Sequence, residues 1–148
     1  MRAFSTSFKE KISKVYAFFP ELQHESIVCG IIRKFGVIQG TATGWTVPPV
    51  FRLRPNASYY TIAHELTHLV QGRKNGVPHG EAACDIWTVD RMPLGFLDQK
   101  PYYLLNRIRV DWNAKNKLAV KKLCRLAIEL RATVRTYISW LRNQIKEL

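Results

Sequence analysis

The sequence predicts an α+β fold on the basis of three observations. Apolar residues recur at helical spacing from Phe4 to Phe19, and Pro20 follows the last of them. Segments rich in β-branched residues come next and are separated by Gly and Pro, which is typical of short strands. Residues 56–71 and 80–91 then show the spacing of helices with one apolar face. We therefore expect a small sheet and several helices.

Capping and turn-forming residues predict the borders of these elements. Ser5 or Ser7 can cap the first helix, and Asn56 or Ser58 can cap the helix that follows the strands. The predicted strands are residues 27–35, 37–39, 41–47 and 50–54. The predicted breaks lie at residues 48–49, 55–56, 76–78 and 92–95, which contain Pro, Gly or Asn.

The composition is that of a globular protein with a marked positive charge. Of 148 residues, 47% are hydrophobic and 23% are charged, and the formal net charge is +12. Residues 101–148 contribute +8 of that charge. Three cysteines without C-x-x-C spacing, Cys29, Cys84 and Cys124, predict buried free thiols in a reducing compartment. The charged N-terminus is not that of a signal peptide, and no apolar run reaches about 18 residues, so we expect a cytoplasmic protein.

The residues that can carry chemistry are concentrated in the motif His-Glu-x-x-His. His64 and His68 are four residues apart and therefore lie on one face of the predicted helix. Two imidazoles at this spacing can bind one zinc ion through a ring nitrogen each. Glu65 lies beside them, where it can accept a proton from a zinc-bound water. The motif predicts one zinc ion per chain; the alternative is two surface histidines on a solvated helix.

A catalytic zinc site needs a third protein ligand, with one position left open for water. The metzincin pattern is excluded, because Gln71 and Lys74 stand where its Gly and His would be. The remaining candidates downstream are His79, Glu81, Cys84 and Asp85. Two of these, Glu81 and Asp85, form E-x-x-x-D on one face of the next predicted helix.

This pair of motifs resembles the gluzincin clan of zinc metallopeptidases. Only twelve residues separate His68 from Glu81, and this spacing, together with the string G-E-A-A-C-D-I-W-T, resembles the short minigluzincins over roughly residues 5–95. The resemblance implies that Glu81 is the third zinc ligand and that Asp85 hydrogen-bonds His64. It also implies a minimal zincin-like catalytic domain at residues 1–98, made of a backing helix, a small mostly antiparallel sheet, the metal-binding helix and a glutamate helix.

Alternatives to Glu81 stay open at this point. His79 follows Pro78 in a predicted loop and can be a ligand, a hydrogen-bond donor to the reacting carbonyl or an exposed side chain. Cys84 would make a softer site, closer to a structural zinc. The side chain of Cys84 points about 100° away from that of its neighbour Asp85 on the helix. We expect it to be a buried, unreactive thiol. Glu81 itself can be a carboxylate favoured by the helix dipole.

The predicted site implies a peptidase mechanism. Glu65 would accept the proton of the attacking water and later donate it to the leaving amine. A further donor must stabilise the oxyanion, and the sequence offers His79, Arg91, Tyr59, Tyr60, Tyr102 and Tyr103. The resemblance also implies that the substrate lies extended along an edge strand, for which residues 41–47 with Trp45 are the best candidate.

The C-terminal part, residues 99–148, is predicted to be a basic helical extension outside the resemblance. A helical segment is predicted near residues 102–109, and a long helix from about Asn116 to the end. The apolar stripe of that helix consists of Leu123, Ala127, Leu130, Val134, Ile138, Leu141, Ile145 and Leu148. Its basic stripe consists of Lys117, Lys121, Arg125, Arg131, Arg135, Arg142 and Lys146.

We expect the apolar stripe to pack on the catalytic domain. The alternatives are a homodimer seam, a basic contact with nucleic acid or an acidic membrane, and self-inhibition. In the last case the extension would cover the cleft, and the full chain would be a latent zymogen with a peptide or protein substrate.

Two other function classes stay open. One is a DNA-associated regulatory peptidase with the same motif, which the basic extension favours and DNA-dependent activity would identify. The other is a non-catalytic nucleic-acid-binding protein with a structural metal or none. For that class, changing Glu65 would leave the function intact.

Overall fold

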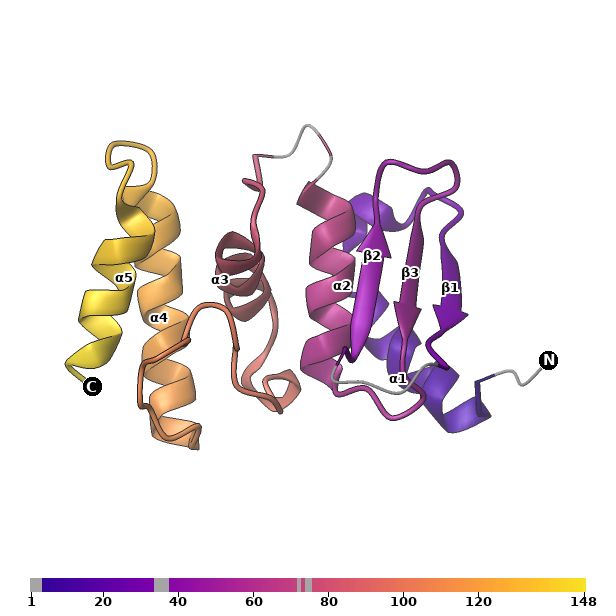
Figure 1. Ribbon diagram of the computed structural model, residues 1–148, viewed down its shortest axis with the longest axis horizontal. Helices are drawn as coiled ribbons and strands as arrows, with labels where there is room; N and C mark the ends of the chain where they lie inside the picture. Colours follow the sequence, from indigo (N-terminus) through magenta and orange to yellow (C-terminus); the bar gives the residue numbers. More distant parts are fainter. Residues whose placement is uncertain (1–3, 34–37, 72, 74–75) are drawn as a thin grey trace. The chain divides into compact units, whose positions relative to one another are not determined.

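The computed structural model describes residues 4–33, 38–71, 73 and 76–148 (Figure 1). The chain divides into two compact units, Met1–Val77 and Pro78–Leu148. We call them unit 1 and unit 2. The domain border predicted at residue 98 stays a prediction. Part of the predicted strands 27–35 and 37–39 lies outside the described residues.

Among the described residues, unit 1 has a sheet of three short strands. They are β1 (Val28–Ile31), β2 (Gly40–Thr43) and β3 (Val50–Leu53), in the order β1-β3-β2. The central strand β3 pairs parallel with β1 and antiparallel with β2. The sheet is therefore mixed, and the expected antiparallel arrangement holds for only one of the two pairings.

The strand predicted at residues 41–47 ends earlier than expected, at Thr43. The hydroxyl of Thr46 lies 3.1 Å from the carbonyl oxygen of Thr43 and 3.0 Å from that of Pro48, and its single proton can be donated to either. Either bond holds a turn where the sequence predicts further strand. The strand that remains, β2, lies at an edge of the sheet, as the sequence analysis expects.

Two helices and a short 3₁₀ helix complete unit 1. α1 (Thr6–Tyr16) is followed by η1 (Pro20–Leu22), and α2 (Tyr59–Gln71) follows the sheet. Predicted caps begin both α-helices: Ser5 Oγ accepts from Phe8 N–H, and Ser58 Oγ accepts from Thr61 N–H. α2 packs against β2 and β3, and α1 packs against α2. The core of unit 1 is formed by Phe8, Val15, Phe19, Leu22, Phe51, Leu53, Ile62, Leu66 and Leu69.

Unit 2 is helical in its described residues. It consists of α3 (Glu81–Arg91), η2 (Leu94–Phe96), α4 (Ala114–Leu130) and α5 (Tyr137–Lys146). α4 packs against α3, and α5 packs against α4 (Figure 1). α3 confirms the helix predicted at residues 80–91. No helix among the described residues is long and apolar enough to span a membrane.

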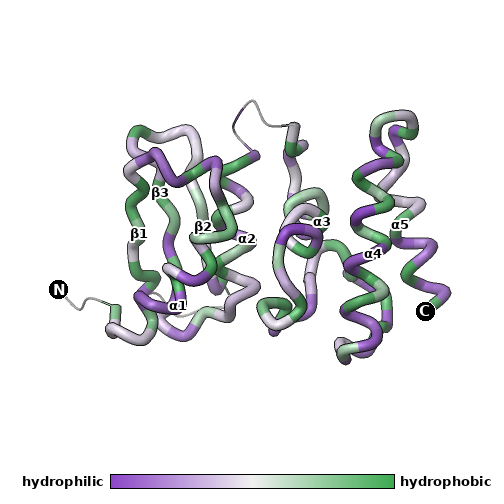
Figure 2. Tube along the Cα trace, turned by 180° about the vertical axis from the view of Figure 1, so that it is seen from behind, coloured by the Kyte–Doolittle hydropathy of each residue, from purple (hydrophilic) through white to green (hydrophobic). Residues whose placement is uncertain are grey.

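The prediction of one long C-terminal helix is wrong. Turns at residues 131–136 separate α4 from α5, and this break changes the helical phase. A single helical wheel therefore cannot describe both α4 and α5, although hydrophobic and hydrophilic residues alternate along each helix (Figure 2). The buried side chains on the two helices are Val120, Cys124, Ala127, Tyr137, Leu141 and Ile145, three of which belong to the predicted apolar stripe.

The helical segment predicted near residues 102–109 is also wrong. Residues 102–107 form turns, because their backbone groups bond to side chains from other elements. The N–H of Leu104 donates to Asp85 Oδ2 at 2.9 Å. Arg142 donates to the carbonyls of Leu104 and Tyr103, at 3.1 and 3.0 Å.

The predicted basic stripe is largely used inside unit 2. The ammonium of Lys121 donates to the carbonyls of Val89, Asp90 and Met92, and so caps the C-terminal end of α3. Arg125 forms an ion pair with Asp90 at 2.9 Å. Burial lowers the pKa of Lys121, although Asp90 nearby raises it.

Two more stripe residues also make internal contacts. Arg142 holds the turns described above, and the guanidinium of Arg131 lies 5.8 Å from the centre of the Trp87 ring. Four of the seven stripe residues therefore bind their own fold.

Candidate metal centre

Helix α2 places the two histidines of the motif on one face. The ring centres of His64 and His68 are 4.6 Å apart with perpendicular planes, and a ring nitrogen of each lies within 4.8 Å of the other's. His64 is buried at 8% exposure, and His68 is half-buried. The predicted helical placement of the motif is confirmed. These two side chains are therefore not the solvated surface pair that the alternative interpretation required.

A side chain one turn further along α2 sets the orientation of His68. Nδ1 of His68 lies 2.6 Å from Oε1 of Gln71, which is itself buried. An amide oxygen can only accept, so a proton on Nδ1 would be donated to Gln71 and would leave the ring's lone pair on Nε2. This is the tautomer that coordinates a metal through Nε2. The sequence analysis used Gln71 only to exclude metzincins, although its spacing from His68 could have revealed this contact.

The carboxylate of Glu65 is buried in unit 1 beside the edge strand. Its exposed fraction is 6%. A methyl group on Gly40, the first residue of β2, would lie 2.6 Å from Cγ and 2.9 Å from Oε1 of Glu65. Glycine at this position therefore makes the room that Glu65 occupies. Gly40 is not among the residues predicted from the sequence, where its place directly before the strand predicted at residues 41–47 is the available signal.

The candidate residues of unit 2 lie at the start of α3. Glu81 is the first residue of the helix and is exposed, and His79 before it is exposed as well. Asp85 is 1% exposed, and its Oδ2 accepts the backbone hydrogen bond from Leu104. Cys84 is fully buried. The roles predicted for Glu81 and Asp85 stay predictions.

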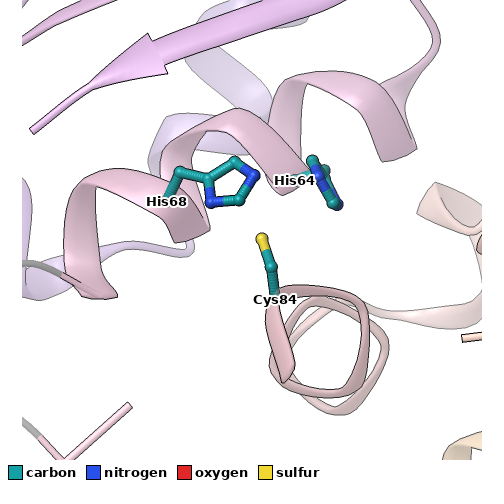
Figure 3. A group of neighbouring side chains, drawn as sticks. All are labelled: His64, His68 and Cys84. Atoms are coloured by element: carbon teal, nitrogen blue, oxygen red, sulfur yellow. The ribbon is translucent and has the colours of Figure 1, made fainter. Parts of the chain in front are cut away.

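His64 and His68 supply two ligand atoms that a metal ion could use (Figure 3). Two neutral imidazole nitrogens are donors that suit zinc, and a third protein ligand would leave one tetrahedral position open. The chemistry of these donors therefore fits the metal that the motif predicts. Cys84, also drawn in Figure 3, and Glu81 both belong to unit 2, and the choice of the third ligand stays a prediction.

No protein-family model, curated protein or solved structure matches this chain.

The candidate oxyanion donors differ in exposure. Tyr102 is 67% exposed and Tyr103 is exposed too, whereas Tyr60 is buried. Tyr59 and Arg91 are half-buried. Trp45, predicted to line a cleft, is 85% exposed in the turn after β2. A catalytic role for any of these residues stays a prediction.

Proposed function

We propose that the chain is a zinc-dependent metallopeptidase. The observation that carries this proposal is the arrangement on α2: His64 and His68 on one face, with the buried carboxylate of Glu65 next to them. A bound zinc ion supplies the Lewis acidity that activates water at neutral pH and polarises a peptide carbonyl. We propose His64, His68 and Glu81 as its ligands.

The remaining steps belong to the chain's own residues. Glu65 accepts a proton from the attacking water and delivers it to the amine that leaves as the peptide bond breaks. Gln71 holds the imidazole of His68 in the tautomer with its lone pair on Nε2. Gly40 leaves the space in which the Glu65 carboxylate sits. β2 lies at an edge of the described sheet, where an extended substrate could add itself as a further strand.

Metal content tests the ligand set. We expect about one zinc ion per purified chain, lost in His64→Ala and in Glu81→Ala but retained in Cys84→Ala. Mass spectrometry of the intact protein measures this directly. Cys124→Ala is the matched control, because that thiol is also fully buried in unit 2. Normal zinc binding by His64→Ala would refute the site, whereas loss of zinc in Cys84→Ala alone would make Cys84 the third ligand.

The space beside Glu65 provides a second test. In Gly40→Ala the added methyl group would lie closer to Glu65 Cγ than carbon atoms approach, so the carboxylate must shift. We expect kcat to fall by about ten-fold or more, since a misplaced general base loses much of its effect. Gly44→Ala is the control, because its methyl group would meet other atoms only at 3.6 Å. Equal peptidase activity in both variants would show that Gly40 does not position Glu65.

A non-catalytic protein with a structural metal is the second candidate. Cys84, one of the downstream ligand candidates in the sequence, favours it, because soft thiolate ligands are typical of structural zinc sites. The nucleic-acid-binding form of this alternative has less support, since four cations of the predicted basic stripe make internal contacts. Zinc binding without any peptide hydrolysis would favour this candidate.

A further inference from the structure

A small pocket in unit 2 is not used by the proposed metal site. Its volume is about 270 Å³, and it lies in the segment between η2 and α4. The residues that line it are Lys100, Pro101, Tyr102, Leu105, Asn106, Arg107 and Ile108. All belong to one continuous segment of nine residues.

Hydrogen bonds from outside hold this segment in one shape. Asp85 accepts from the N–H of Leu104, and Arg142 donates to two successive carbonyls. Further along, the indole N–H of Trp112 donates to the carbonyl of Leu97 at 2.9 Å. A pocket held in this way is formed before a ligand arrives, which lowers the entropy cost of binding.

The polar lining of the pocket is cationic. It contains Lys100, Arg107 and the amide of Asn106, and it contains no carboxylate. The side chain of Arg107 is exposed and forms no hydrogen bond or ion pair with the described residues. Lys100 uses one long contact, 3.5 Å to the carbonyl of Ile108, and keeps further N–H donors. Two cations on one small concave surface attract an anion.

The backbone of Arg107 supports a functional role. Its φ of 64° lies in the left-handed region, which side chains other than those of Gly, Asn and Asp rarely adopt. Glycine would take this conformation without strain. A guanidinium at a strained position on a fixed turn is typical of a residue whose side chain is used.

We propose that this pocket binds a small organic anion, a phosphate or carboxylate carried on an apolar body about the size of one ring. Arg107 and Lys100 bind the oxyanion, since guanidinium groups match its planar or forked oxygens. Pro101, Leu105, Ile108 and the ring of Tyr102 contact the apolar body. The proposal stands independently of the zinc site.

Binding to the full-length chain tests this proposal. Calorimetry with phenyl phosphate and benzoate should show saturable binding, and the better of the two identifies the preferred oxyanion. Arg107→Gln and Lys100→Gln should each weaken binding by about ten-fold or more. Arg109→Gln is the matched control: Arg109 is exposed, directly follows this segment and does not line the pocket. If Arg107→Gln does not fold, Arg107→Gly replaces it, because glycine tolerates the backbone conformation.

Four results would overturn the proposal. They are the absence of saturable binding by both ring anions, wild-type affinity in the Arg107 variant, an equal loss in Arg109→Gln, and equal binding of neutral benzyl alcohol. Inorganic phosphate tests the apolar contact. It should bind at least about ten-fold more weakly than phenyl phosphate. Equal affinity of the two would show that the pocket does not bind the apolar ring of the ligand.

Discussion

Glu65→Gln should lower peptide hydrolysis by at least about 100-fold and leave zinc bound, because glutamine keeps the shape of the side chain but cannot carry the proton. Glu65 is buried, so bulk solvent has little access to its carboxylate. Initial rates on a quenched fluorescent peptide library, with zinc content measured on the same samples, give both quantities.

The control for this variant is Glu129→Gln, which removes the same charge from an exposed position on α4. It should keep wild-type activity. Unaltered hydrolysis by Glu65→Gln would remove Glu65 as the general base. Loss of zinc together with activity would instead give Glu65 a part in holding the metal.

Ending the chain after Asp98 should abolish the folded state of unit 2. The truncation removes α4 and α5, which pack in series on α3, and also the ammonium of Lys121 that caps α3. Val120, Leu104, Leu141 and Ile145 are fully buried. At about 1.5–3 kcal/mol each, their burial approaches the total stability of a typical domain, about 5–15 kcal/mol. We expect aggregation or loss of helical circular dichroism.

The self-inhibition hypothesis predicts the opposite outcome for the same truncation. If residues 102–148 cover the cleft, the shortened chain should stay folded and cleave peptides faster than the full chain. The point variant Leu141→Ala is the control for lost stability. It weakens the packing of α5 without removing a helix. A folded and more active truncated chain would show that the extension regulates a latent enzyme.

The structure is predicted best from the sequence where the residues of a single helix contain all the signals for that helix. The helix α2 combines a capping residue, helical periodicity and the His-Glu-x-x-His spacing, and all three are local. The same is true of α3, which begins after Gly80 and ends before Met92-Pro93. The positions of His64, Glu65 and His68 on one helix could therefore be predicted with few assumptions.

Other features depend on contacts between distant residues, which no local pattern contains. Gly40 and Glu65 are far apart in the sequence, so their close approach needs the sheet to be built first. The turns at residues 102–107 form because Asp85 and Arg142 take their backbone groups. Lys121 belongs to a regular basic stripe, but its partners are carbonyls of another helix. The periodicity therefore predicts which face of a helix is charged, but not which groups the charged side chains bind.

The order of the strands has a consequence for how the chain folds. β2 and β3 are joined by six residues and form a local antiparallel pair, which can close early. β1 can join only afterwards, because its partner β3 lies 22 positions later in the register Val28↔Val50. The β2–β3 hairpin would therefore act as the folding nucleus of unit 1, and β1 and its parallel pairing would set the slower step.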